Sequence, residues 1–530
     1  MPATRRPASD REHLRPTFSP SRAAHYRRTG GPWDRGSLDS SFARTARAEV
    51  SDGRVRLSSD ELEARVSALA GCLRASGVRR GDAVAWQLPN GVCAVLLYRA
   101  CWRLGAVAVP VHHRMGSAEV EAALAQVDPV VVVASKGAPA SERASAIVLE
   151  GGPDPAELEE MLPLAPAVLL GSTASKGSDL AVALFTSGST GVPKAALHTH
   201  RALGYKAAFM IGVHGLGRDD AVLMPAPLAH VSGLLNGVLI PGVAGIPSAL
   251  MTAWDPDEAL GRIEEVAVSF MGAPPVFFSQ MASASGFGRE RVRSMRLIST
   301  GGASVSPAFV DATAEAFGCR VKRTYGSTEA PTVTTSGPGD DPGRARDTDG
   351  RALGEVEIEV HDPETLERLG PGEPGELWLR GPELFVGYAD PAANSNAFAR
   401  PGGWFRSGDL GVLDESGWLQ VVGRLSDIVI RAGENISASE VEAVLEAHPS
   451  IRHAVVVGVP DALLGERLAA FVESSEDFAL SDCREWFERR GVTKFKTPEL
   501  VVRLAALPHL ATGKADRATL RKMAADLVGG

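Results

Sequence analysis

The spacing of apolar residues changes along the chain, and each change predicts a different kind of element. Residues 59–79 (SDELEARVSALAGCLRASGVR) carry apolar side chains three and four positions apart, which predicts an amphipathic helix with Ser59 as its N-cap. Short, almost wholly apolar runs such as AVAWQLP are typical of strands buried on both faces. The predicted order is helix 59–79, strand 83–89, helix 92–105, strand 106–111, helix 117–127 and strand 128–135.

The same alternation continues from residue 197 to residue 300. The predicted elements are a helix near 201–212, a strand at 221–227, a helix after His230, a helix at 255–266 and strands at 268–274 and 295–302. Alternating strands and helices indicate α/β layers around a largely parallel sheet.

From residue 351 to 422 the pattern becomes short strands separated by Gly/Pro turns, which predicts an antiparallel β subdomain. A βαβ-like pattern follows: IVIRAG, a helix from Ser437 to about His448, AVVVGVP, LAAFVES and a helix from Ser481. A chain of 530 residues exceeds what one core usually supports. We therefore predict a large N-terminal domain of layered α/β subdomains plus a β subdomain, followed by a small, mobile α+β C-terminal domain. The predicted boundaries are a flexible basic leader at 1–30, the large domain at 31–423, a hinge at 424–427 and the small domain at 428–530.

Composition narrows the classes of protein. The 55 Lys and Arg against 64 Asp and Glu give a net charge of −9, which argues against broad nucleic-acid binding. The sequence contains no stretch of about 18 apolar residues, so we predict no transmembrane helix. The five cysteines form no CxxC pair, which favours neither a zinc site nor a disulfide framework and is typical of a reducing, cytoplasmic compartment: Cys72, Cys93, Cys101, Cys319 and Cys483.

Residues 185–194 (FTSGSTGVPK) combine glycines, hydroxyl side chains and a lysine after the apolar run AVALF. Glycines let the backbone approach a phosphate, hydroxyl and N–H groups donate to its oxygens, and a lysine supplies charge. The Walker pattern fails, because Pro193 and Ala195 stand where its second glycine and its Ser/Thr would fall. The residues therefore predict a polyphosphate site of another kind.

TSGSTGVPKA resembles the signature loop of the AMP-forming, adenylate-forming superfamily, and most closely its acyl- and aryl-CoA ligase branch. Six further motifs resemble that family in the same order: PLAHVSGL (227–234), STGGAS (299–304), TYGSTEA (324–330), WFRSGDLG (404–411), GRLSDIVIRAGENISASEVE (423–442) and ATGKADR (511–517). The resemblance implies an enzyme, an acid–thiol ligase. It would join a carboxylic acid to the α-phosphate of ATP, release pyrophosphate, and pass the acyl group to CoA.

The resemblance also implies a role for each motif residue. Lys514 would bridge the carboxylate and the α-phosphate, Glu329 with Thr186 would hold Mg²⁺, and Thr328 would donate to the α-phosphate. The other implied nucleotide contacts are Ser187, Gly188, Ser189, Thr190, Gly191 and Lys194 in the loop, Gly302, Ala303, Tyr325 and Gly326 near adenine, and Asp409 and Arg424 near ribose. His230 would gate the acyl tunnel and, with Gly433, line the pantetheine tunnel.

Some positions depart from the family pattern. Ser426 occupies the implied hinge pivot, where relatives usually carry Asp or Lys, and the following Asp427 is a partial substitute. Ser407 replaces a threonine and Ala432 replaces a glycine. The implied acyl pocket is apolar or small, which favours a neutral hydrophobic short- or medium-chain, alicyclic or aryl acid: Val231, Leu235, Gly272, Ala273, Val305 and Pro331.

Alternatives stay open at this point. A stand-alone enzyme that loads an acyl carrier protein would carry the same motifs, because a carrier's phosphopantetheine arm is chemically like that of CoA. A non-catalytic nucleotide-binding scaffold would tolerate the loss of Lys514 or Glu329, yet both residues are present. A luciferase-like oxygenase shares the first half-reaction. The acid and the oligomeric state are not encoded in these motifs.

Overall fold

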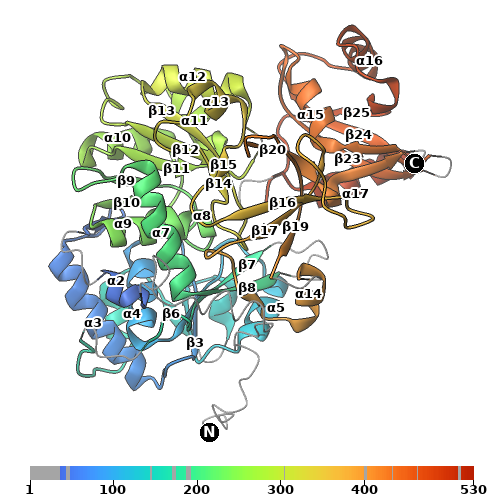
Figure 1. Ribbon diagram of the computed structural model, residues 1–530. Helices are drawn as coiled ribbons and strands as arrows, with labels where there is room; N and C mark the ends of the chain where they lie inside the picture. The colour runs from blue at the N-terminus through green and yellow to red at the C-terminus, as the bar shows by residue number, and fades with distance from the viewer. Residues whose placement is uncertain are drawn as a thin grey trace. The chain divides into compact units, whose positions relative to one another are not determined.

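The computed structural model describes residues 36–42, 48–143, 146–169, 175–186, 193–303, 305–398, 403–431, 434–461, 464–510 and 515–529 (Figure 1). It contains two compact units. The first comprises the described residues up to Glu357 together with Leu379–Phe405, and the second comprises Ile358–Trp378 together with those from Arg406 onward.

The first unit is built on two mixed sheets rather than on one. The nine-stranded sheet runs β15 (Arg351–Ala352), β14 (Thr334–Thr335), β13 (Arg320–Tyr325), β12 (Leu297–Gly301), β11 (Phe270–Ala273), β9 (Val222–Met224), β10 (Ser248–Leu250), β1 (Val50–Ser51), β2 (Arg56–Leu57). The seven-stranded sheet runs β18 (Gly387–Tyr388), β8 (Lys194–Thr199), β7 (Leu180–Thr186), β4 (Val107–Pro110), β3 (Ala83–Gln87), β5 (Val131–Ser135), β6 (Ala146–Leu149). Neighbours pair in parallel in the middle of both sheets. Pairing is antiparallel at both ends of the nine-stranded sheet and at the β18 end of the seven-stranded sheet, whereas β5 and β6 at its other end pair in parallel. This mixed, largely parallel arrangement confirms the predicted α/β class.

The helices of the first unit lie between and around these strands. They are α2 (Leu38–Phe42), α3 (Ser59–Ala75), α4 (Val92–Leu104), α5 (Ser117–Val127), α6 (Pro155–Glu160), α7 (His200–His214), α8 (Val231–Leu234), α9 (Ile240–Ala244), α10 (Pro256–Val266), α11 (Pro275–Ala282), α12 (Pro307–Phe317), α13 (Pro342–Asp347) and α14 (Pro391–Ala397). A π-helical turn, Leu235–Leu239, joins α8 to α9, and a 3₁₀ turn spans Pro139–Glu142.

The N-cap of α3 corrects one prediction. Ser58, not Ser59, caps the helix: its Oγ accepts from the Glu61 backbone N–H, and the Glu61 carboxylate accepts from the Ser58 N–H at 2.9 Å. Both serines are compatible with a cap in sequence. The reciprocal bonds decide for Ser58, because they need the acidic residue at the third helical position.

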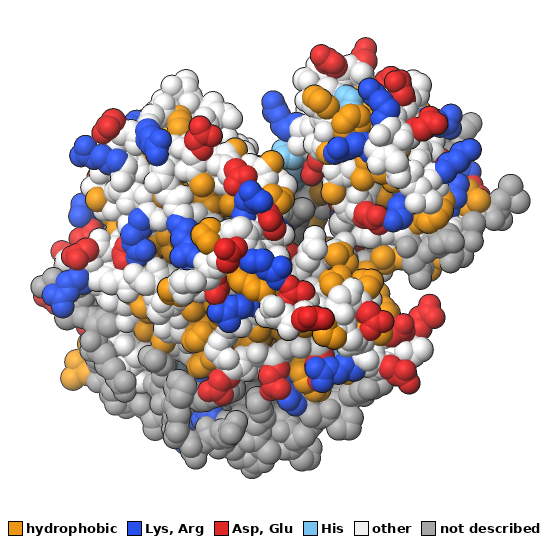
Figure 2. Space-filling model, turned by 45° about the horizontal axis from the view of Figure 1, so that its top comes forward, with side chains coloured by type: hydrophobic (Ala, Val, Ile, Leu, Met, Phe, Trp, Pro, Cys, Tyr) orange, Lys and Arg blue, Asp and Glu red, His pale blue; other side chains and the backbone are white. Residues whose placement is uncertain are grey.

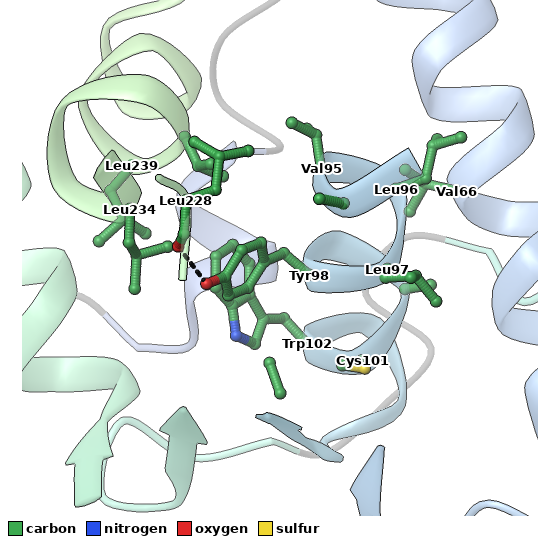
Figure 3. Packing of buried hydrophobic residues seen from close by; sticks show 14 of the residues in the cluster. Val66, Val95, Leu96, Leu97, Tyr98, Cys101, Trp102, Leu228, Leu234 and Leu239 are labelled. Atoms are coloured by element: carbon green, nitrogen blue, oxygen red, sulfur yellow. Dashed lines mark hydrogen bonds between the residues drawn. The ribbon is translucent and has the colours of Figure 1, made fainter. Parts of the chain in front are cut away.

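Helix α4 is buried all around and connects the two sheets (Figure 3). The Tyr98 hydroxyl donates to the Leu228 carbonyl at 2.7 Å, in the segment that follows β9. Trp102 Nε1 donates to the Ala181 carbonyl of β7 at 3.0 Å. The apolar side chains of α4 pack with Val66 of α3 and with Leu234 and Leu239, which follow β9 in the chain. Each such side chain contributes about 1.5–3 kcal/mol by leaving water, so α4 is a main stabilising element of the first unit.

The second unit contains two further sheets. The predicted antiparallel β subdomain is a sheet in the order β16 (Glu357–His361), β17 (Gly375–Arg380), β19 (Phe405–Leu413), β20 (Leu419–Arg424). The second sheet runs β22 (Glu434–Ser437), β21 (Ile428–Arg431), β24 (Gly465–Ser474), β23 (Ile451–Asp461), with β25 (Leu500–Arg503) beside β24. Its helices are α15 (Ala438–Glu446), α16 (Leu480–Arg489) and α17 (Arg517–Gly529), with 3₁₀ turns at Leu425–Asp427 and Lys494–Lys496. The predicted hinge at 424–427 lies inside this unit and stays a prediction.

Charged side chains of both signs are interspersed on the face of the first unit that Figure 2 shows. Among the described residues, no helix combines the length and the low polarity needed to cross a bilayer. All five cysteines are free thiols, and four of them are buried.

Candidate active site

The hydroxyl-rich loop connects two neighbouring strand ends. Strands β7 and β8 pair antiparallel, and Thr186 at the end of β7 lies opposite Lys194 at the start of β8. The predicted phosphate-binding residues Ser187, Gly188, Ser189, Thr190 and Gly191 lie outside the described residues. The end of β7 and the start of β8, which flank these residues, are nevertheless paired side by side.

Thr328 and Glu329 lie in a tight turn that follows β13. Ser327 N–H donates to the Ala330 carbonyl at 3.0 Å, and Ala330 N–H donates back to Ser327 Oγ at 3.2 Å. Gly326 has no room for a side chain, because a Cβ there would lie 2.4 Å from the Thr332 backbone nitrogen. The TYGSTEA motif therefore encodes one specific turn, with Thr328 and Glu329 half-buried between its two ends.

Three contacts from distant segments hold this turn. His198 Nε2 lies 2.8 Å from the Thr328 carbonyl, Phe385 N–H donates to the Glu329 carbonyl at 2.8 Å, and the Tyr388 hydroxyl donates to Glu329 Oε1 at 2.7 Å. Burial lowers the pKa of His198 to about 4, so the ring is neutral near pH 7. Because a carbonyl only accepts, the proton of that neutral ring resides on Nε2.

Lys194 joins this cluster through an aromatic ring. Its Nζ lies 5.6 Å from the centroid of the Tyr388 ring, a cation–π geometry. Lys194, Tyr388 and Glu329 are thus contiguous, with Thr186 paired across from Lys194. The structure brings together four predicted residues here: Thr186, Lys194, Thr328 and Glu329. Sequence reasoning missed His198 and Tyr388, whose only signals are the polar HTH run and the GY pair in otherwise apolar strands.

The predicted adenine contacts lie beside Tyr325. Strands β12 and β13 are parallel, and Gly301 pairs with Thr324, so both strands end at the same edge of the sheet. Gly302 has φ +77°, a left-handed conformation that favours glycine, and an added Cβ would meet nothing within 4 Å. Gly302 and Ala303 are exposed while Tyr325 is largely buried. The edge can therefore receive a flat ligand close to the backbone.

The predicted acyl-pocket residues divide between two apolar clusters. Leu235 and Val231 pack in the cluster that contains Phe270, whereas Ala273 and Val305 pack in the cluster that contains Met271. Successive residues of β11 thus face opposite sides of the nine-stranded sheet. Pro331 is buried directly after the Glu329 turn.

Gly272 of β11 lies next to the π-helical turn that joins α8 to α9. A Cβ on Gly272 would lie 2.9 Å from Nδ2 of Asn236, which lies in the π-helical turn. Asn236 itself donates to the Ser232 carbonyl at 3.0 Å. Sequence reasoning did not single out Asn236. It adds a polar carboxamide to a set of residues that was predicted to be apolar.

His230 ends the segment after β9 and occupies the N-cap position of α8, as predicted from the change of strand to helix. Its ring lies 5.2 Å from the ring of His112, which stacks on His113 at 4.6 Å. Burial, followed by the neighbouring His230 and His113, lowers the pKa of His112 to about 3. Gln87 braces this loop by donating to the carbonyls of His112 and Met115. The predicted gate, His230, therefore lies beside two stacked histidines, and Gln87 anchors the backbone of one of them, His112.

The predicted ribose contacts lie in the second unit. Asp409 of β19 and Arg424 of β20 are cross-strand neighbours, and Arg424 Nε lies 2.7 Å from Asp409 Oδ1. Asp409 is buried, whereas Arg424 is half exposed. Ser407 donates to the Leu377 carbonyl and accepts from the Asp409 N–H, so it fixes the turn at Gly408, where φ is +70°. A serine is sufficient for both bonds at this position.

The predicted pivot is exposed, and its neighbour carries the contacts. Ser426 lies in the 3₁₀ turn, and its carbonyl accepts from Arg521 of α17 at 3.3 Å. Asp427 lies 3.4 Å from both Arg517 and Arg521, and Arg517 also pairs with Glu442 of α15 at 2.7 Å. Lys514, Ala432 and Gly433 lie outside the described residues.

The donor set suits magnesium bound together with a nucleotide. Among the described residues, no three His, Cys, Asp or Glu side chains converge on a common point as a metal cage would. Mg²⁺ is commonly held by one or two carboxylates plus phosphate oxygens and waters, and Glu329 offers one such carboxylate beside the loop flanks. The residues present therefore fit a metal that arrives with its phosphates.

The paired strands that flank the hydroxyl-rich sequence, the glutamate turn and the glycine edge fit a nucleotide-dependent, adenylate-forming enzyme. The family model for AMP-binding enzymes matches residues 38–389, and the model for the AMP-binding enzyme C-terminal domain matches residues 440–514. The chain belongs to this family and is an acid–thiol ligase.

Relatives of known name support the same class. The chain is 33% identical over 535 residues to a medium-chain fatty-acid–CoA ligase of Escherichia coli K12, covering 96% of this chain and 93% of the relative. It is 34% identical to a 2-hydroxy-7-methoxy-5-methyl-1-naphthoate–CoA ligase of Streptomyces carzinostaticus, covering 95% of each. The crystal structure of ATP-bound MatB from Rhodopseudomonas palustris superposes with a TM-score of 0.84 at 26% identity, over 93% of this chain and 99% of that one.

Proposed function

We propose that the protein activates a carboxylic acid with ATP to an acyl-AMP and then transfers the acyl group to CoA. The observation that carries the proposal is the cluster in which the Glu329 turn, Lys194 and Thr186 are held together at the two ends of the hydroxyl-rich loop. Such a cluster offers carboxylate, hydroxyl and ammonium groups to one polyphosphate. The fold, the family and the named relatives agree with this chemistry.

The first half-reaction joins two anions. The acid's carboxylate oxygen attacks the α-phosphorus, an O–P bond forms, and pyrophosphate leaves with its electron pair. Lys194 and Thr186 orient the phosphates, and the Thr328 hydroxyl donates to an α-phosphate oxygen. Mg²⁺, when bound, screens the phosphate charge and stabilises the leaving pyrophosphate. Lys514 supplies the ammonium charge between carboxylate and phosphate, where a point charge counts most.

The second half-reaction needs a different set of residues. The thiol sulfur of the pantetheine arm attacks the acyl carbonyl, AMP leaves, and the thiol proton goes to solvent. His230 and Gly433 line the path of this arm. Rotation about 424–427 exchanges the two faces of the small domain, and the contacts between Asp427 and Arg517 and Arg521 set how readily that turn moves.

The acid is a neutral hydrophobic one of short or medium chain, or an alicyclic or aryl acid. The small or apolar candidates Val231, Leu235, Gly272, Ala273, Val305 and Pro331 support this class. The relatives that act on a medium-chain fatty acid and on a naphthoate also support it. Asn236 adds one hydrogen-bonding group, which suits an acid with a single polar substituent.

The experiment that tests the function is a two-part assay with purified protein. ATP, Mg²⁺ and a panel of hydrophobic acids are supplied first without a thiol and then with CoA or with a phosphopantetheinylated carrier protein. We expect acid-dependent pyrophosphate release in the first part and acyl-CoA in the second. A thioester on the carrier alone would overturn CoA as acceptor, and the absence of AMP with every acid would support a non-catalytic scaffold.

A further inference from the structure

Residues 383–389 (ELFVGYA) tie β8 to the Glu329 turn. The backbone N–H groups of Val386 and Ala389 donate to the carbonyls of Leu197 and Ala195 at 2.8 and 2.9 Å. Immediately before Val386, Phe385 N–H donates to the Glu329 carbonyl. This segment, which we call the strap, therefore contacts β8, which follows the hydroxyl-rich loop, and also contacts the glutamate turn.

Tyr388 is the side chain of the strap that reaches the chemistry. Its hydroxyl donates to Glu329 Oε1 at 2.7 Å, a charge-assisted hydrogen bond across 59 positions of sequence. Its ring receives the Lys194 ammonium at 5.6 Å. One residue thus contacts both a cation and an anion of the cluster.

Neighbouring residues hold both the backbone and the ring of Tyr388 in place. The Asn394 carboxamide closes a pair of bonds on the Tyr388 backbone: its Oδ1 accepts from the Tyr388 N–H at 2.7 Å, and its Nδ2 donates to the Tyr388 carbonyl at 2.9 Å. The ring lies edge-on to Phe385, with centroids 4.8 Å apart. Backbone and ring are both constrained, so the hydroxyl has little freedom to leave the carboxylate.

We propose that Tyr388 is a positioning residue that orients the Glu329 carboxylate for the nucleotide-bound metal. This inference rests on the proposed function, in which Glu329 binds that metal. The hydroxyl holds Oε1, and Oε2 is the oxygen that we assign to the metal. A carboxylate that is already oriented loses less rotational freedom when the metal arrives, so the bond raises affinity without touching the metal.

The test compares Tyr388→Phe with wild type. This substitution keeps the ring, its contact with Phe385 and the cation–π geometry, and it removes only the hydroxyl. The readout is binding of Mn²⁺, as a paramagnetic probe of the magnesium position, in the presence of a non-hydrolysable ATP analogue, measured from the free-ion electron paramagnetic resonance signal. We expect the Mn²⁺ affinity to fall about 10-fold, the range typical for groups that orient metal ligands. Affinity for the analogue without metal should not change.

Two further variants make the result specific. Tyr205→Phe is the matched control, because Tyr205 is a buried tyrosine of the same unit whose hydroxyl accepts from the Glu355 N–H rather than donating to Glu329; it should bind Mn²⁺ as wild type does. In a Glu329→Gln background, Tyr388→Phe should cause no additional loss. Unchanged Mn²⁺ affinity in Tyr388→Phe, or additive losses in the double variant, would overturn the inference.

This assay needs no acid and no turnover. Failure of the proposed function would instead appear as wild-type protein that never forms AMP with any acid. The two failures are therefore seen in different experiments.

Discussion

Lys206 and Glu383 form an ion pair that offers a quantitative test of the fold around the site. Lys206 of α7 and Glu383 of the strap are almost completely buried, and Nζ lies 3.3 Å from Oε1. Lys206 also donates to the Thr332 carbonyl at 2.8 Å, just beyond the Glu329 turn, where Thr332 has φ +49°. Burial lowers the pKa of Lys206 and raises the pKa of Glu383, while each partner's charge opposes the shift of the other.

Lys206→Met removes the ammonium and leaves a buried carboxylate without its counter-charge. Breaking a buried pair in this way costs about 3–5 kcal/mol of the free energy of unfolding. Lys206→Met/Glu383→Met removes both charges, so only the Thr332 carbonyl loses a donor, at a cost of about 1–3 kcal/mol. The double variant should therefore be more stable than the single variant.

Urea unfolding followed by tryptophan fluorescence measures these differences. Lys136→Met is the matched control, since Lys136 Nζ lies 2.7 Å from Glu150 Oε2 but the two side chains are 69% and 64% exposed. That variant should lose much less stability than Lys206→Met does, because solvent screens an exposed pair. A Lys206→Met variant as stable as Lys136→Met, or a double variant less stable than the single one, would show that the buried pair does not stabilise this region.

Three other predictions address the chemistry, the pocket and pH. Lys514→Ala should nearly abolish acid-dependent pyrophosphate exchange but spare thioester formation from synthetic acyl-AMP; equal loss of both rates would contradict its assigned role. Gly272→Ala should force the Asn236 side chain to move, because the new Cβ would lie 2.9 Å from Nδ2, and should shift AMP formation across an acid series toward smaller acids; an unchanged profile would place the pocket elsewhere. Burial lowers the pKa of Lys322 to about 8 from an ordinary 10.5, so the folded state holds its proton less tightly than the unfolded chain does. Wild type should therefore lose stability relative to Lys322→Met as pH falls from about 10.5 to about 8, by about 3 kcal/mol in total, in unfolding experiments at fixed salt; a pH-independent difference would rule this out.

Local patterns were sufficient for much of the fold. The apolar run at 92–105 predicts a helix, and helix α4 covers all but the last of those residues, because burial on all sides agrees with its composition. The strand-to-helix change at His230 was also predicted from the local pattern. The division of the strands between two sheets was not, since an apolar run does not specify its partner strand. WFRSGDLG was read as a motif, yet it forms most of β19, which pairs antiparallel with β20.

In the candidate site, too, contacts between residues close in sequence could be predicted and long-range contacts could not. Thr186 and Lys194 lie eight positions apart, so a hairpin between two strands brings them together. The contacts of Thr328 with His198 and of Glu329 with Tyr388 span 130 and 59 positions, and no local signal connects them. The motifs therefore identify the residues that we propose meet the substrate, whereas the residues that hold them emerge only from the tertiary structure.

ATP–pyrophosphate exchange across a panel of carboxylic acids measures directly whether the protein forms an acyl-AMP. We expect exchange that depends on a hydrophobic acid and on Mg²⁺, and that falls sharply in Glu329→Gln. Wild-type protein that binds nucleotide but shows no exchange with any acid would contradict this expectation.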